Sequence, residues 1–164
     1  MKKAAYGILL MIMIAALFSS CSDEKIAEPA EYLIFGHFYG FCLGEDCIQI
    51  YKLENDRLYI DQNKTYPRYD AFYDASFVEL DIKYYELVDD LEMYFPSQLL
   101  NETDTILGCP DCADRGGLYI EYKTETIHKY WLIDQDKSRV EPYLYEFMEQ
   151  VNDKIEEINS IGMQ

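Results

Sequence analysis

The first 21 residues place the strongest constraint on what this chain can fold into, because they mark the rest for export. Lys2 and Lys3 form a short positive segment, and the stretch from Ala4 to Phe18 carries no charge. A positive start, a short apolar core and the small residues that follow at 19 and 20 are typical of a secretory signal. The alternative is an uncleaved membrane anchor. The apolar stretch has only 15 residues, however, whereas a helix that spans a bilayer needs about 20.

The residues around Cys21 make this prediction more specific. The stretch Leu-Phe-Ser-Ser-Cys, residues 17–21, resembles a bacterial lipobox, although Phe18 occupies the usual leucine position and Leu17 stands one place earlier. The resemblance implies that Cys21 is acylated, with palmitate among the chains, and becomes the mature N-terminus. Acyl chains contribute about 0.8 kcal/mol per buried methylene, so several chains hold a protein at a membrane. The expected partner is therefore a membrane, reached through the N-terminal lipid and not through a spanning helix.

The residues after Cys21 bear on which side of the membrane the protein faces. Ser22-Asp23-Glu24 resembles the surface-export signal of Bacteroidota lipoproteins. An ordinary solvated tether is the alternative, and it would leave the protein facing the periplasm. We expect a cell-envelope, outer-membrane lipoprotein, with surface exposure as the open question.

Charge and aromatic content restrict the classes of function. Residues 21–164 comprise 144 residues with 12 basic and 31 acidic side chains, a net charge of −19. Binding to nucleic acid or to anionic lipid headgroups depends on Lys and Arg, so neither is expected. The chain has 16 tyrosines and eight phenylalanines, which disfavours disorder. Tyrosine is common on half-buried sheet faces, although a Tyr-rich surface could also bind sugars or peptides.

The pattern of apolar residues predicts a single α+β domain. We expect a signal peptide at 1–20, the lipidated cysteine with a flexible tether at 21–31, and one domain at 32–160. Strand-like segments fall at 32–39, 48–53, 57–61, 118–123 and 128–133, and helical spacing falls at 81–95 and from Pro142 onwards. Asn55-Asp56 suits a tight hairpin, and 62–76 is expected to be irregular. The order β-β-β-α-β-β-α predicts a mainly antiparallel sheet of about five strands, with two amphipathic helices on one face.

Four cysteines remain after Cys21, and an even number in an exported chain predicts two disulfides. The sequence leaves all three pairings open. In the loop-entropy model, closing Cys42 to Cys47 contributes about 2 kcal/mol, whereas a bridge from this pair to Cys109 and Cys112 contributes about 4 kcal/mol. A cross-linked arrangement would therefore stabilise the fold more, if the geometry permits it.

Two other uses of these cysteines stay open. The spacings Cys42-x4-Cys47 and Cys109-Pro110-Asp111-Cys112 suit the two halves of a structural zinc site. A reactive Cys-x-x-Cys pair instead needs a helix N-terminus or a cation beside it. Here a strand follows, Asp111 and Asp114 disfavour a thiolate, and Arg115 is the only local cation. The residues favour disulfides first, metal second and reactive thiols last.

Other candidate chemistry is sparse. His37 and His128 fall within predicted strands, where a lone histidine is usually structural, although either could join a metal site near the cysteines. Residues 134–138 place oxygen ligands at alternate positions, as a calcium loop does, but the sixth position is Arg139 and not glycine, and the twelfth is Tyr145 and not glutamate. We interpret them as an acidic loop.

The segments 36–53 and 108–133 resemble a group of Bacteroidota lipoproteins with a cysteine-containing domain of unknown function. Cys42 with Cys47, the Cys-Pro-Asp-Cys stretch, Gly116-Gly117 and residues 131–134 carry the resemblance. It implies a shared domain and no activity. The expected function is a non-enzymatic binding or structural module without a cofactor. The alternative is a thiol-redox or zinc-binding domain that uses Cys42, Cys47, Cys109 and Cys112.

Overall fold

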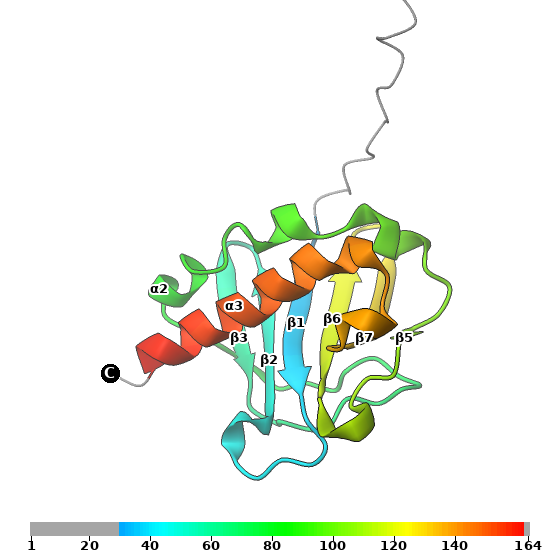
Figure 1. The fold of residues 1–164 in the computed structure, drawn as a ribbon. Coiled ribbons are helices and arrows are strands. Elements are labelled where there is room, and N and C mark those ends of the chain that lie inside the picture. The colour runs from blue at the N-terminus through cyan, green and yellow to red at the C-terminus, as the bar shows by residue number, and fades with distance from the viewer. Residues whose placement is uncertain (1–29, 163–164) are drawn as a thin grey trace, which may run out of the picture.

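The computed structural model describes residues 30–162, which form one sheet with a long helix across one face (Figure 1). The predicted signal peptide, Cys21 and residues 22–24 lie outside the described residues. The strands are β1 (Tyr32–Phe38), β2 (Ile48–Glu54), β3 (Arg57–Asp61), β4 (Phe77–Glu79), β5 (Ile106–Leu107), β6 (Gly117–Lys123) and β7 (His128–Asp134). The α-helices are α2 (Ile82–Tyr85) and α3 (Tyr145–Gly162).

The sheet confirms the α+β class and corrects the number of strands. Its order is β4-β3-β2-β1-β6-β7-β5, so seven strands replace the five expected. All neighbouring strands are antiparallel except β5, which runs parallel to β7. The two strands that the sequence did not indicate have three and two residues, too few to show an alternating pattern.

The tight hairpin between β2 and β3 is confirmed. Asn55 and Asp56 both have positive φ, at 52° and 58°, the conformation that a two-residue turn between twisted strands needs. The turn fixes the register in which Leu53 faces Leu58. Both side chains are buried, so the local turn and the core select the same pairing.

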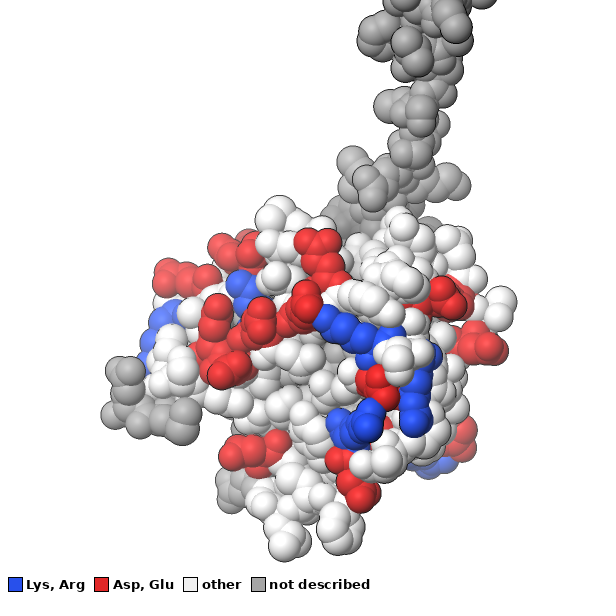
Figure 2. All heavy atoms as spheres, in the orientation of Figure 1, with Lys and Arg blue, Asp and Glu red and all other residues white. Residues whose placement is uncertain are grey.

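The first face of the sheet carries the main core. Along β1, Leu33 and Phe35 point to this face, and the partners Leu53, Tyr51, Tyr122 and Ile120 continue it. The helix α3 covers these residues with one apolar side, formed by Phe147, Met148, Val151, Ile155 and Ile158. Asp and Glu side chains gather along its outer side (Figure 2), as the amphipathic pattern predicts.

The helix expected at 81–95 is wrong as a continuous α-helix. Only α2 is α-helical, and the chain then continues through turns into η3 (Leu91–Tyr94), a 3₁₀ segment. Hydrogen bonds here join residues three apart, such as Val88 N–H to Tyr85 C=O and Leu91 N–H to Val88 C=O. A three-residue apolar spacing fits both kinds of turn, so the pattern alone could not distinguish them. The first of the two expected helices is therefore short, and the next segment, η4 (Ser97–Asn101), is again 3₁₀.

The second face of the sheet is covered by the irregular segment 62–76. Ile34, Phe38, Ile50, Tyr119 and Leu132 form a smaller core on this face. Tyr73 packs against Tyr119 with ring centroids 5.4 Å apart, and Tyr66 meets Phe38 edge-on at 5.1 Å. The tyrosine-rich surface is thus mainly a half-buried sheet face and its cover.

Candidate functional site

Both pairs of cysteines lie at one end of the sheet, which we call the distal end. The strand β1 starts at Tyr32, next to the N-terminal segment, and ends at Phe38, beyond which the two cysteine-containing loops follow (Figure 1). Cys42 is bonded to Cys47, and Cys109 to Cys112, with Cα–Cα distances of 5.6 and 5.5 Å. The predicted disulfides are therefore present, each within its own pair and not between the pairs. Within residues 30–162, no group of three or more His, Cys, Asp or Glu side chains could hold a metal ion.

A groove of about 620 Å³ opens at the distal end of the helix-covered face. One wall is the Cys42–Cys47 loop, and the other is the last part of α3 with Ile158 and Asn159. The floor comes from alternate residues of β1 and β2, which point to the same face: His37, Gln49 and Tyr51. Ile60, Leu80 and Tyr84 complete an apolar side, so the groove combines apolar walls with a polar floor.

The floor is held by a pair of side-chain amides. Gln49 donates to the Asn159 Oδ1 at 2.9 Å, and Asn159 donates to the Gln49 Oε1 at 2.9 Å. Two reciprocal hydrogen bonds fix the end of α3 to β2, 110 residues away in the sequence. Beside them, burial raises the pKa of Tyr51 to about 12, and the charge of Asp46 adds to the effect. The floor therefore offers neutral hydrogen-bonding groups at neutral pH.

His37 is one of these groups, because burial lowers the pKa of its imidazole below 6.5. Contacts with the backbone of Asp46 and with Gln49 oppose the effect but are smaller. The Nε2 atom is buried and has no hydrogen-bond partner among the described residues. A neutral imidazole suits this position, because a buried charge without a partner is costly.

The lowered pKa predicts how acid affects stability. Folded His37 binds a proton less readily than unfolded His37, so its contribution is complete above pH 6.5 and is lost as the pH falls below that value. His37→Gln should therefore lose less stability than the wild type between about pH 7.5 and pH 5.5. Urea unfolding at the two pH values measures this, and an equal loss in both proteins would contradict it.

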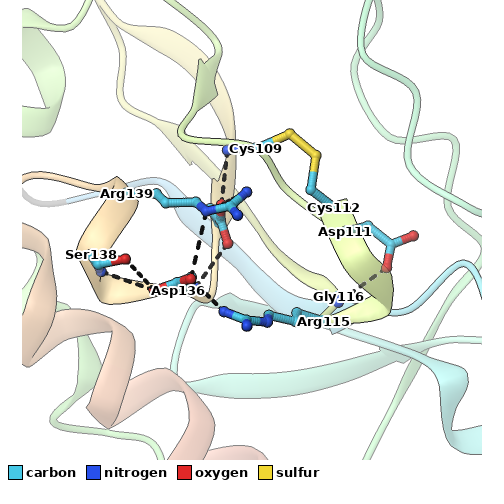
Figure 3. Close-up of polar contacts among 9 residues, drawn as sticks. Cys109, Asp111, Cys112, Arg115, Gly116, Asp136, Ser138 and Arg139 are labelled. Atoms are coloured by element: carbon cyan, nitrogen blue, oxygen red, sulfur yellow. Dashed lines mark hydrogen bonds and ion pairs between the residues drawn. A yellow bond between two sulfur atoms is a disulfide. The ribbon is translucent and has the colours of Figure 1, made fainter.

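The Cys109–Cys112 loop is anchored by carboxylates at the end of β7 and in the turn that follows it (Figure 3). Asp134, which is 1% exposed, accepts the Cys109 N–H at 2.9 Å and the Asp136 N–H at 2.8 Å. Asp136 in turn binds Arg115 and lies 3.6 Å from Arg139. Hydrogen bonds from Ser138, helped by both arginines, lower the pKa of Asp136.

These contacts bear on two hypotheses drawn from the sequence, a calcium loop at residues 134–138 and a reactive cysteine pair. The carboxylates of Asp134 and Asp136 accept backbone N–H groups and lie beside arginines of the protein itself, which supports the interpretation of an acidic loop over a calcium site. Arg115, the local cation considered for a reactive cysteine pair, is engaged by Asp136. The arrangement therefore fixes the disulfide loop in place.

His128 lies far from the cysteines, at the other end of the sheet and on its second face. Its Nε2 is 2.9 Å from the Glu121 carboxylate, which is 3% exposed and also accepts the Tyr32 hydroxyl at 2.9 Å. Phe72 stacks on the imidazole with the ring centres 4.0 Å apart. His128 thus helps to attach the segment 62–76, whereas His37 lines the groove.

Sequence reasoning missed the importance of Asp111, whose carboxylate joins three segments at the distal end. It accepts the Gly40 N–H at 2.8 Å, the Tyr66 O–H at 3.0 Å and the Gly116 N–H at 3.0 Å. Asp in a Cys-Pro-Asp-Cys turn is a signal of backbone capping. Gly40 and Tyr66, the two partners that are distant in the sequence, carry no such signal, because they meet Asp111 only in the folded sheet.

Comparison of the chain with protein-family models, with curated proteins and with solved structures finds no match. None of the helices formed by residues 30–162 has both the length and the apolar character needed to cross a bilayer.

Proposed function

We propose that the protein is a cell-envelope lipoprotein, held at the outer membrane through lipid on Cys21, whose domain is a non-enzymatic binding module. The observation that supports binding most is the groove of about 620 Å³ at the distal end. This volume lies in the range typical of small-molecule sites, which are mostly apolar with a few polar groups. A disulfide in one wall keeps the groove preformed, which reduces the entropy cost of binding.

The position of the groove fits such an anchor. The described chain enters the sheet at Tyr32, while the groove lies at the end where β1 stops (Figure 1). Seven residues of strand span about 23 Å. Lipid on Cys21 would therefore be attached at the end of the domain opposite the groove, which leaves the groove clear of the attachment point.

Two exposed apolar side chains lie in, or just before, the loop that forms one wall of the groove. Leu43 is fully exposed and lines it, and Phe41, two residues earlier, is 85% exposed. Large apolar residues this exposed are candidates for contact with a partner or a ligand. The matching ligand chemistry is amphipathic, with an apolar body for the walls and a hydrogen-bonding group for the floor.

The groove is tested with octyl glucoside below its critical micelle concentration, as a neutral amphiphilic probe. The chain has two histidines, so His37 reports on the groove and His128 serves as an internal control. We expect saturable changes in the NMR signals of the His37 imidazole, with His128 unchanged. Leu43→Asp should weaken binding about fivefold to tenfold, because it removes an apolar contact.

Met93→Asp is the matched control, since Met93 is also exposed, at 78%, but does not line the groove. Its binding should equal that of the wild type. Equal changes at the two histidines, or full affinity in Leu43→Asp, would refute the groove as a binding site.

The anchor is tested separately with Cys21→Ala. The variant should lose the incorporation of radiolabelled palmitate and should no longer sediment with the membranes, because its acyl chains supply the attachment. Cys42→Ala is the control, since it removes a cysteine outside the predicted lipobox and should stay in the membrane fraction. Sedimentation of Cys21→Ala with the membranes would contradict the lipid anchor.

A further inference from the structure

The Cys109–Cys112 disulfide lies at the point where the distal loops are joined. Between its two cysteines, the carboxylate of Asp111 holds Gly40, Tyr66 and Gly116. We call this set of three hydrogen bonds the Asp111 junction. Gly40 leads into the Cys42–Cys47 loop, which is a wall of the groove, and Tyr66 belongs to the segment that covers the second face.

The backbone around Asp111 adopts a conformation that needs support. Asp111, Ala113 and Asp114 have φ of 61°, 60° and 56°, a region that residues other than glycine rarely occupy because Cβ approaches the following carbonyl. The disulfide closes this turn, together with hydrogen bonds from Cys112 N–H to Cys109 C=O at 3.0 Å and from Asp111 N–H to Gly116 C=O at 2.8 Å. Without the covalent bond, the turn can relax to ordinary φ values and carry the Asp111 carboxylate away from its partners.

The two disulfides therefore have different roles. Cys42–Cys47 closes a loop within the groove wall, and the start of that loop is held by Tyr39 N–H to Cys47 C=O at 2.9 Å. Cys109–Cys112 lies outside the wall, but Asp111 between its cysteines holds Gly40, where the chain enters the wall. Arg115 and Asp134 fix the outer parts of the Cys109–Cys112 loop to the end of β7 and the turn that follows it (Figure 3), so movement would centre on Asp111.

We propose that the Cys109–Cys112 disulfide is a redox-sensitive switch: oxidised, it maintains the Asp111 junction, and reduced, it releases the groove wall and the cover of the second face. The reductant is a dithiol. One thiolate of the dithiol attacks a sulfur of the bridge, the S–S bond between Cys109 and Cys112 breaks, and a mixed disulfide forms. The second thiol then displaces the remaining cysteine. The dithiol leaves as a cyclic disulfide, and its two electrons and two protons remain on the two cysteine thiols.

Hydrogen exchange tests the switch without any ligand. The amides of Gly40 and Gly116 report on the Asp111 junction, and those of Phe35 and Ile120 in the sheet show that the domain stays folded. In Cys109→Ser/Cys112→Ser, exchange at Gly40 and Gly116 should be about tenfold faster, as expected when a hydrogen bond is lost, with Phe35 and Ile120 unchanged. The matched control Cys42→Ser/Cys47→Ser should keep the wild-type rate at Gly116.

Two further experiments test the switch if the Cys109→Ser/Cys112→Ser variant does not fold. Asp111→Ala keeps the disulfide and should reproduce the faster exchange at Gly40. Dithiothreitol added to Cys42→Ser/Cys47→Ser reduces only Cys109–Cys112, and should speed exchange at both glycines until reoxidation restores it. Unchanged exchange at Gly40 and Gly116 after this reduction, with the two thiols confirmed by mass, would overturn the switch.

The expected effect on binding rests on the proposed function. Failure of the switch and failure of the groove as a binding site give different results. The Cys109→Ser/Cys112→Ser variant keeps the Cys42–Cys47 disulfide of the groove wall. It should bind octyl glucoside more weakly than the wild type if the released wall lines the site. Faster exchange at the glycines in this variant, together with a wild type that never binds the probe, would uphold the switch and refute the groove as a ligand site. Binding that persists with no change in exchange would uphold the groove and refute the switch.

Discussion

Asp61→Ala is expected to lower the free energy of unfolding by about 3–5 kcal/mol, because it removes a buried acceptor from a hydrogen-bonded network. The Asp61 carboxylate is 1% exposed. It accepts the backbone N–H groups of Asn63, Lys64 and Ser76 at 3.1, 2.8 and 2.7 Å, and the hydroxyl of Tyr73 at 2.8 Å. Without it, both ends of the segment that covers the second face lose their attachment to β3.

Urea unfolding followed by the circular dichroism signal measures the change in stability. Asp70→Ala is the matched control, because Asp70 lies in the same segment but is exposed and binds Arg68 at the surface. The Asp70→Ala substitution should change the free energy of unfolding by no more than about 0.5 kcal/mol. Similar stability of the two variants would show that the Asp61 network contributes little.

Gly36→Val should prevent folding, or destabilise the domain by about 4 kcal/mol or more. Gly36 lies in the middle of β1, between β2 and β6. A Cβ at this position would lie 2.6 Å from the Ile50 Cα and closer still to the Gln49 carbonyl oxygen. These are backbone atoms of the neighbouring strand, so relief requires the two central strands to separate.

The expected result is loss of soluble, cooperatively unfolding protein, which expression and thermal unfolding measure. Ile34→Val on the same strand is the control, since it deletes one methylene from the smaller core and should cost about 1 kcal/mol. A folded Gly36→Val protein with a stability near that of Ile34→Val would contradict the close approach of β1 and β2.

The sequence pattern predicted the elements that are determined by residues close to one another in the chain. The five longer strands, the Asn55-Asp56 turn and the amphipathic C-terminal helix each show their own periodicity or turn residues, and all are present. The α+β class followed from their order. Gly36 carried no such signal, because its role depends on the neighbouring backbone and not on its own strand.

Long-range packing decided the elements that the sequence did not indicate. Ile106 and Leu107 become a strand only because they pair in parallel with Leu132 and Ile133. Residues 81–95 have helical spacing, yet Leu91 and Phe95 enter the core from 3₁₀ turns. Tertiary contacts routinely override such weak local preferences.

The sequence predicted the kinds of residue that the candidate site contains, but not which of them come together in the fold. The even count of Cys42, Cys47, Cys109 and Cys112 indicated disulfides, but their pairing required the three-dimensional structure. The groove joins Gln49 to Asn159 across 110 residues, and Asp111 reaches Gly40 across 71. Neither contact can be read from a single sequence, because each joins segments that come together only when the helix and the loops pack on the folded sheet.

The short outer strands have a consequence for how copies of the protein meet one another. An exposed strand edge offers unpaired N–H and C=O groups to another molecule, and long flat edges promote aggregation. Here the edges are β4 and β5, with three and two residues, so each offers a neighbouring copy little backbone to pair with. Under the proposed lipid anchor, copies of the protein would be held in a two-dimensional layer where collisions between them are frequent, and the short edges would protect against uncontrolled sheet extension. Lengthening β5 by design should remove that protection.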